Sequence, residues 1–466
     1  MENTLQGFFK PKSIAVVGAS KDSQKIGHAA LKNILISDYE CNLYPINPHE
    51  KTILGVPCYK NLNDVKKSID LVLISVPAKI VPAIMRDCVK KQVKNIIIIS
   101  SGFSEIGNHA LEEEIANIIK GKNIRVLGPN TMGYKNASDG LDASFVFGVP
   151  RKGNLSLISQ SGALGIGMIY LANNEFVGVS KIIGVGNKLD IDDDDLIDYF
   201  SQDDDTKVIG LYIEAVKNGR QFMNSIKACN KPVLVVKAGR SGAGARATAS
   251  HTGSMVGSRE VWEGLLRQAG AIQVHTLEEL IDIAVTFRFM RLPRGRRMAM
   301  VAGGGGASVL ATDTSVASGF TMPAVPGAVA EEIRRSLPTE AGAVVSNPVE
   351  LNMSPESSYT IASSLLKADA YDMLLGHCVF GQPPWPVFNP WYDLVCDTVT
   401  SVHRDVDKPV AIILESDVPG ESEWYLGLEG RYWEAGIPVY HSVAGACRAI
   451  DRFMRHRQAR GTAGGR

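Results

Sequence analysis

Short apolar runs alternate with amphipathic stretches along residues 12–150. Five runs rich in Val, Ile and Leu predict β-strands. Between these runs, apolar residues recur at helical spacing and predict α-helices. Strands that are apolar throughout and separated by helices are typical of a parallel sheet covered on both faces. The predicted strands are 13–17, 42–46, 71–76, 95–99 and 124–128, and the predicted helices lie near 27–37, 79–92 and 108–120.

The same alternation recurs twice more along the chain. A second unit spans residues 150–290, and a third unit follows a linker at 291–295. The third unit opens with a strand at 298–301 and a glycine-rich turn at 302–308. The sequence therefore predicts three successive α/β units. Further strands are predicted at 155–158, 179–183, 208–213, 232–236, 372–379 and 409–414.

The acidic run at 190–195 lies between two of these strands. Carboxylates can bind a metal, but acidic residues also favour the N-terminus of a helix. We interpret the run as a solvated loop that leads into a helix.

Composition and charge narrow the class of protein. The chain has 466 residues, enough for two or three domains at about 150 residues each. Its 49 basic residues balance its 49 acidic residues, so nothing favours binding to nucleic acid or to an anionic membrane. No apolar run reaches the roughly 20 residues that span a bilayer, and residues 1–4 lack the features of a signal peptide. The seven cysteines have no metal-ligand spacing, so we expect reduced thiols, no metal site and a cytoplasmic location.

The turn after the first predicted strand has the composition of a phosphate-binding loop. Residues 17–27 join a strand to a helix, where backbone amides can hold an anion, and Lys25 is a candidate cation. The turn departs from the dinucleotide fingerprint because Ser20 stands where the second glycine belongs. Asn47 follows the second strand in place of the acid that would bind an adenosine ribose. A plain glycine turn with surface lysines remains the alternative.

A second loop of this kind lies at 159–163 in the next unit. The amides of Gly162 and Ala163, after Ser161, could bind an anion at a helix N-terminus. Glu214 follows a later strand of the same unit, so it is expected at the same edge of the sheet. A carboxylate there could bond one nitrogen of an imidazole and leave the other nucleophilic.

His251 is the candidate imidazole. It lies in a long run of small residues, 247–257, which follows the strand at 232–236. An imidazole can accept and transfer a phosphoryl group. For an isolated histidine, a surface residue in a Gly/Ala/Ser loop would be the simpler interpretation.

As an ordered set, the motifs identify a family. The chain resembles the α subunit of the ADP-forming acyl-CoA synthetases, of the archaeal acetyl-CoA synthetase type within the succinyl-CoA synthetase superfamily. The resemblance covers nearly the whole chain, and the set is specific although each motif alone is weak. The matching pieces are 17–20, 45–48, 75–77, 100–103, 128–130, 159–162, 186–187, 212–214, 250–254, 303–306 and 347–351.

The resemblance implies a fold, a reaction and a set of site residues. The implied fold is α/β, with a Rossmann-like CoA-binding domain (1–145) followed by two flavodoxin-like α/β domains, a ligase domain (150–290) and an additional domain (295–457). It implies that His251 is phosphorylated, that Glu214 orients it, and that Ser161, Gly162 and Ala163 bind phosphate. The residues implied for CoA are Gly18, Ala19, Ser20, Lys25, Asn47, Pro48, Val76, Pro77, Ser101, Gly102, Phe103 and Asn130.

The same resemblance implies substrates and a partner. The enzyme would interconvert acyl-CoA, ADP and phosphate with a small carboxylic acid, CoA and ATP. Mg-ADP or Mg-ATP would be held mainly by a separate ATP-grasp β subunit, in an α2β2 assembly, because no stretch after residue 290 resembles that domain. The Pro- and Trp-rich stretch 382–392, expected to be irregular, is not a feature of the family and could lie at a partner interface.

Two other classes of protein are open to the sequence. One is a non-catalytic CoA-binding regulatory subunit, against which the presence of both His251 and Glu214 argues. The other is an NAD-dependent dehydrogenase, which Ser20 and Asn47 disfavour.

Overall fold

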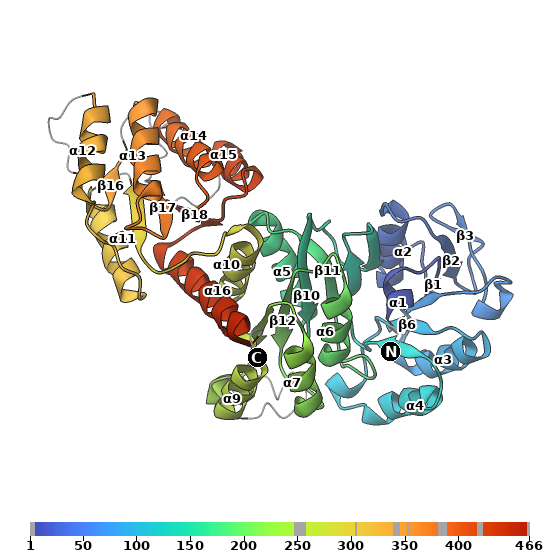
Figure 1. Cartoon of the computed structure of the whole chain (residues 1–466). Coiled ribbons are helices and arrows are strands. Elements are labelled where there is room, and N and C mark those ends of the chain that lie inside the picture. Colours follow the sequence, from blue (N-terminus) through green and yellow to red (C-terminus); the bar gives the residue numbers. More distant parts are fainter. Residues whose placement is uncertain are drawn as a thin grey trace. The chain divides into compact units, whose positions relative to one another are not determined.

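The chain forms two compact units, Met1–Leu280 and Ile281–Arg466 (Figure 1). The computed structural model describes residues 5–246, 258–302, 305–338, 345–351, 354–380, 389–416 and 423–463.

The first unit begins with a five-stranded parallel sheet in the order β2-β1-β5-β6-β7. All five predicted strands and the three predicted helices are confirmed, with ends that differ by a few residues. The three central strands β1, β5 and β6 are rich in Val, Ile and Leu and are buried at every residue, because helices cover both faces of the sheet. The elements are β1 (Ser13–Val17), α2 (Ile26–Ile36), β2 (Asn42–Ile46), β5 (Leu71–Ile74), α3 (Val81–Lys90), β6 (Asn95–Ile98), α4 (His109–Ile119) and β7 (Arg125–Leu127).

A seven-stranded sheet completes the first unit, in the order β14-β13-β12-β10-β11-β8-β9. Five of its strands are parallel, and four of these were predicted. Its strands are β10 (Lys152–Ser159), β11 (Val179–Gly184), β12 (Val208–Ile213), β13 (Val233–Lys237) and β14 (Ile272–Val274), and its helices are α5 (Gly162–Asn174), α6 (Asp193–Gln202), α7 (Gly219–Ala228) and α9 (Arg259–Ala269). Helix α10 (Leu277–Phe289) begins at the end of this unit, and most of its residues belong to the second unit.

Strands β8 (Gly133–Asn136) and β9 (Leu141–Ser144) form an antiparallel edge on this second sheet. The sequence analysis did not predict them, because each has only four residues and neither contains a run of apolar side chains. The side chain of Asn33 on α2 donates to the carbonyl oxygens of Ser144 and Val146, at 3.0 Å each. Segments from both sheets are therefore joined here, and the proposed division into domains stays a prediction.

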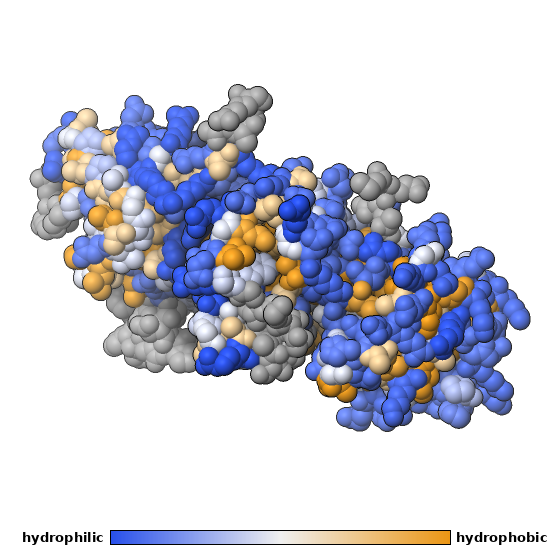
Figure 2. Space-filling model, turned by 90° about the horizontal axis from the view of Figure 1, so that it is seen from below, coloured by the Kyte–Doolittle hydropathy of each residue, from blue (hydrophilic) through white to orange (hydrophobic). Residues whose placement is uncertain are grey.

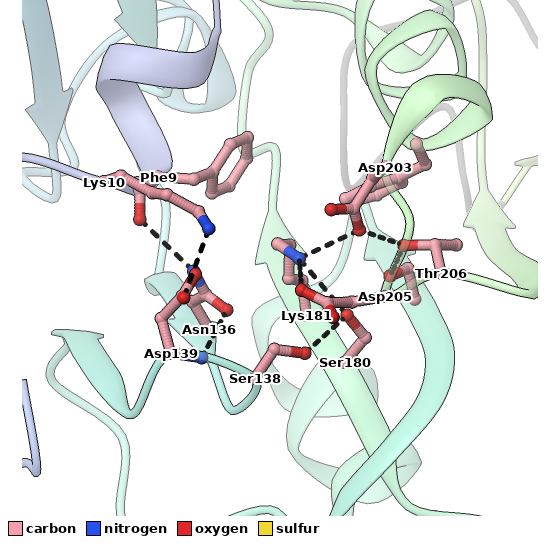
Figure 3. A network of polar contacts seen from close by, with 12 residues as sticks. Phe9, Lys10, Asn136, Ser138, Asp139, Ser180, Lys181, Asp203, Asp205 and Thr206 are labelled. Carbon is pink, nitrogen blue, oxygen red and sulfur yellow. Dashed lines mark hydrogen bonds and ion pairs between the residues drawn. The ribbon is translucent and has the colours of Figure 1, made fainter.

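The N-terminal helix α1 (Gln6–Phe9) is inserted between the two sheets. The ring of Phe9 stacks on Tyr199 with 4.6 Å between centroids and meets Tyr134 edge-on at 5.0 Å. Beside these rings, the buried Lys181 forms an ion pair with Asp203 at 2.9 Å (Figure 3). This cluster fixes the amino-terminal ends of β11 and β12, opposite the edge that carries the candidate site.

The second unit contains a five-stranded parallel sheet in the order β16-β15-β17-β18-β19. This is the doubly wound order of a flavodoxin-like fold, so the predicted α/β class is confirmed. The elements are β15 (Met298–Ala302), α11 (Gly305–Ala317), α12 (Gly327–Ser336), β16 (Val349–Glu350), α13 (Pro355–Lys367), β17 (Met373–Phe380), α14 (Asn389–Asp405), β18 (Val410–Ser416), α15 (Glu423–Glu434), β19 (Val439–Tyr440) and α16 (Val443–Ala463).

Part of the stretch expected to be irregular is helical. Trp391 and Tyr392 lie in α14, where the ring of Tyr392 also packs against Trp424 on α15. Residues 382–388 of the same stretch lie outside the described residues.

The face of the molecule shown in Figure 2 is mainly hydrophilic. On the face shown in Figure 2, apolar side chains form separate patches among polar ones. Within the described residues, no helix is long and apolar enough to cross a membrane.

Candidate functional site

Five loops of small residues lie along one edge of the first sheet. They follow β1, β2, β5, β6 and β7, and parallel pairing places the carboxyl ends of these strands together. Hydrogen bonds connect neighbouring loops: Asn47 Nδ2 donates to the Ala19 carbonyl at 2.8 Å, and Val76 N donates to Ser100 Oγ at 3.2 Å. Asn130 N donates to the Ser100 carbonyl at 2.9 Å. The fold thus brings together the loops that carry all the residues predicted to bind CoA.

The turn after β1 requires glycine. Gly18 has φ +88°, and a Cβ there would lie 2.2 Å from the Ser75 carbonyl oxygen. A Cβ on Gly27 would lie 2.0 Å from the Gly18 carbonyl oxygen. The chain therefore folds back tightly into α2, and the exposed Lys25 stands directly before that helix. A close turn before a helix N-terminus is a suitable geometry for an anion.

Some of the predicted residues can offer a ligand only their backbone. The side chains of Ala19 and Phe103 are fully buried in the core. The amides of Gly102 and Phe103 donate to Glu105 Oε1, at 2.5 Å and 3.2 Å. Burial alone would raise the pKa of Glu105, but hydrogen bonds from Asn187 and from these amides hold it below its ordinary value. Glu105 was missed by sequence reasoning, although its place two residues after Phe103 was a usable signal.

Asn187 links this loop to the second sheet. Its Nδ2 atom donates to Glu105 at 2.7 Å and to Glu112 and Ser104 at 3.1 Å each. The backbone N–H of Asn187 also donates to the Pro129 carbonyl at 2.9 Å. One side chain therefore fixes the loop after β6 against the loop after β11.

The second group of candidates lies at the carboxyl ends of β10 and β12, which are paired neighbours. Ser161 is the N-cap of α5, with its hydroxyl accepting from Leu164 N at 3.4 Å. Gly162 and Ala163 begin the helix and are exposed. Their amides are in the position where a helix N-terminus binds an anion.

Glu214 lies directly beyond β12 and is 3% exposed. Its amide donates to Gln160 Oε1 at 2.8 Å, and Tyr212 Oη donates to its Oε1 atom at 3.4 Å. Gln160 directly precedes Ser161, the N-cap of α5. Its hydrogen bond with Glu214 therefore shows that Glu214 and the α5 N-terminus lie at the same edge of the second sheet, as predicted from the sequence. Sequence reasoning did not identify Gln160 as the residue that joins them.

The acidic run 190–195 is not the solvated loop that we expected, although it does lead into helix α6. Asp192 is the N-cap of α6 and forms a capping box with Asp195. Lys188 pairs with Asp192 at 2.9 Å and with Asp193 at 2.8 Å. Asp193 is fully buried, and burial raises its pKa to about 6 despite the opposing charge of Lys188. The run is buried because Lys188 is a buried cation, and a buried cation needs carboxylate partners.

His251 and its run 247–257 lie outside the described residues, so the role predicted for this histidine remains a prediction. Across the described part of the chain, no group of three or more His, Cys, Asp or Glu side chains could hold a metal ion.

Three family models match successive parts of the chain. A CoA binding domain matches residues 12–137, and a succinyl-CoA ligase like flavodoxin domain matches 152–287. A ligase-CoA domain matches residues 298–449.

Relatives match most of the chain. The acetate–CoA ligase [ADP-forming] II subunit alpha of Pyrococcus furiosus is 38% identical over 382 residues, 80% of this chain and 82% of that subunit. The acetate–CoA ligase [ADP-forming] of Methanocaldococcus jannaschii is 39% identical over 343 residues, 73% of this chain but 48% of that longer protein. Among solved structures, the dinucleotide forming acetyl-coenzyme A synthetase 1 of Ca. Korarchaeum cryptofilum, in complex with phosphate and ADP, is 34% identical with a TM-score of 0.86. That match covers 99% of each chain.

Proposed function

Because this chain belongs to the family of ADP-forming acyl-CoA synthetases, we propose that it is the subunit that binds CoA and carries the phosphoryl group of such an enzyme. The observation that carries the proposal is the convergence of Glu214 and the α5 N-terminus at the carboxyl ends of β12 and β10. Residues 1–145 would bind CoA, residues 150–290 would transfer the phosphoryl group, and residues 295–457 would form the additional domain.

The reaction has three bond exchanges. A phosphate oxygen attacks the acyl carbonyl of acyl-CoA. The carbon–sulfur bond breaks, CoA leaves as its thiol, and the other product is an acyl phosphate. A ring nitrogen of His251 then attacks the phosphorus atom, and the carboxylate of the free acid leaves. Finally, a terminal phosphate oxygen of ADP attacks the phosphorus atom of the phosphohistidine, the phosphorus–nitrogen bond breaks, and ATP forms as the His251 ring is released.

Each group of site residues has a part in this scheme. The amides of Gly162 and Ala163 hold phosphate at the helix N-terminus. Glu214 bonds one ring nitrogen of His251 and steadies the charged ring. The five loops of the first sheet bind CoA, with Lys25 as a cation for its phosphates.

A partner subunit completes the proposal. The Pyrococcus furiosus relative is a subunit alpha, and an ATP-grasp β subunit would hold Mg-ADP in an α2β2 assembly. The exposed apolar side chains of Val309, Leu310 and Val316 on α11 are suited to contact with another chain. The acid substrate is a small carboxylic acid, as in the acetate–CoA ligases that match this chain.

Phosphohistidine formation tests the function directly. The chain is incubated with acetyl-CoA and labelled phosphate, and we expect protein-bound label that acid removes and alkali spares. His251→Ala should abolish the label, and Glu214→Gln should slow its formation strongly, since loss of an orienting carboxylate can cost about 10⁴ in rate. Isothermal titration should show that both variants still bind CoA and that none of the proteins binds NAD.

Two results would contradict the proposal. Label that persists at the wild-type level in His251→Ala would place the phosphoryl acceptor elsewhere. A wild-type chain that binds CoA but never takes label, even with a β subunit present, would instead identify a regulatory subunit.

A further inference from the structure

Lys237 is a buried cation at the edge that carries Glu214. It is the last residue of β13 and is 3% exposed. β13 pairs with β12, and Lys237 lies opposite Ile213, the residue before Glu214. Lysine is rarely buried to this extent without a charged partner.

Within the described residues, the contacts of Lys237 use only part of the hydrogen-bonding capacity of its ammonium group. Its Nζ atom donates to the Ala238 carbonyl at 2.5 Å and lies 4.8 Å from the centroid of the Trp262 ring. An ammonium group has three donors. Within the described ranges, no second hydrogen bond and no ion pair within 4 Å uses this group.

Other cations at this edge are engaged elsewhere. Lys188 is paired with two aspartates, and the Nζ atom of Lys217 donates to the Lys188 and Leu189 carbonyls. The Arg240 guanidinium contacts the ring of His275. Glu214 is the charged group whose field acts on the Lys237 ammonium.

Phosphoryl transfer makes a cation necessary here. A phosphoryl group carries about two negative charges at neutral pH, and it would approach a site that already holds the buried carboxylate of Glu214. Without a nearby positive charge, burial and repulsion would favour protonation of that carboxylate. A protonated Glu214 could no longer stabilise a charged imidazole ring.

We propose that Lys237 is a positioning residue of the phosphoryl-transfer site, whose ammonium group acts through its charge to keep Glu214 ionised. This inference rests on the proposed roles of Glu214 and His251. It adds a residue on a third neighbouring strand, so that β10 supplies the anion-binding amides, β12 the carboxylate and β13 the balancing cation.

The arrangement predicts an alkaline limit for phosphoryl transfer. Burial lowers the pKa of Lys237 to about 8, although the charge of Glu214 raises it in part. Above about pH 8 the ammonium group loses its proton and the balancing charge disappears. Tyr212, which donates to Glu214, has a pKa raised to about 12 by burial and by Glu214, and Trp262 does not titrate.

The test is the rate of phosphohistidine formation between pH 6 and 10. In the wild-type chain, the rate should fall about tenfold per pH unit above pH 8, as expected for loss of one proton. Lys237→Arg should keep at least a tenth of the wild-type rate and lose this fall, because a guanidinium stays charged. Lys237→Met should be at least tenfold slower at pH 7 and flat on the alkaline side. Lys227→Met, at an exposed position on α7, is the matched control and should behave as wild type.

A double variant separates positioning from stability. If Lys237 acts through Glu214, adding Lys237→Met to Glu214→Gln should slow the reaction no further. Thermal unfolding and CoA titration of Lys237→Met at pH 7 should match the wild-type chain. A wild-type rate in Lys237→Met, or an unchanged alkaline fall in that variant, would overturn this inference alone. A wild-type chain that takes no label would overturn the proposed function and this inference with it.

Discussion

The side chain of Gln160 joins the ends of two neighbouring strands by accepting a hydrogen bond from the amide of Glu214 at 2.8 Å. The same oxygen accepts from Ala215 N at 3.2 Å. Gln160 itself begins the turn into α5, with Ser161 as the N-cap. The carboxylate of Glu214 and the helix N-terminus are therefore held in a common frame by one amide group.

Gln160→Ala should slow phosphohistidine formation at least tenfold. Two backbone donors lose their acceptor, which should also lower the free energy of unfolding by about 1–3 kcal/mol. The measurements are label incorporation at 25 °C and thermal unfolding. Asn61→Ala is the control, since Asn61 Oδ1 likewise accepts from two amides, those of Asn63 and Asp64, at a surface turn. A Gln160→Ala chain that transfers phosphoryl groups at the rate of the control would show that this frame is not needed.

Asn187→Ala should weaken CoA binding more than it slows turnover. The substitution removes the donor to Glu105, Glu112 and Ser104, so the loop at 101–103 loses its anchor to the second sheet. We expect the KM for CoA to rise at least fivefold with a smaller change in kcat. Asn173→Ala is the control, because the Asn173 side chain likewise joins two segments, accepting from Arg151 N and donating to the Val149 carbonyl. Equal KM values for the two variants would argue against coupling of these loops.

Lys181→Met should destabilise the fold and leave the chemistry intact. Lys181 is fully buried and pairs with Asp203 at 2.9 Å and with Asp205 at 3.6 Å (Figure 3). Breaking a buried pair leaves an uncompensated charge and costs about 3–5 kcal/mol. Lys10→Met breaks an exposed pair with Asp139 and should cost less than about 1 kcal/mol. Denaturant unfolding measures both, and similar losses in the two variants would contradict the expectation.

His403 should make the second unit less stable in mild acid. The residue is 8% exposed on α14, and burial together with the Arg291 charge lowers its pKa to about 4. An unfolded histidine takes up a proton near pH 6.5. Between pH 6.5 and 4 the unfolded chain therefore binds more protons, and the free energy of unfolding falls as the pH falls.

His403→Leu removes this proton uptake. The loss of stability between pH 7.5 and pH 5 should shrink by roughly 1–2 kcal/mol, measured by urea unfolding of the full chain. Identical losses in the variant and the wild-type chain would show that other groups control the acid response.

The sequence by itself determined most of the elements and the shared edges of the candidate loops. Apolar runs such as 95–99 and helical spacing such as 27–37 reflect local periodicity, which a single segment carries within itself. Once the strands are parallel, every loop after a strand lies at one edge, so Gly18 and Asn47 could be placed together. The loop that contains Gly18 was also predicted to follow the first strand, and the structure adds a positive φ at Gly18 that favours glycine.

The tertiary structure decided what depends on contacts between distant segments. Strand order is such a property. It placed the end of β12, and with it Glu214, between Gln160, which follows β10, and Lys237, the last residue of β13. The antiparallel strands β8 and β9 were missed because their polar sequences are stabilised by partners rather than by periodicity. The bridge from Asn187 to Glu105 likewise joins residues that lie 82 positions apart in the sequence. Local patterns do not encode such pairings, since their free energy arises only when the segments meet in the folded chain.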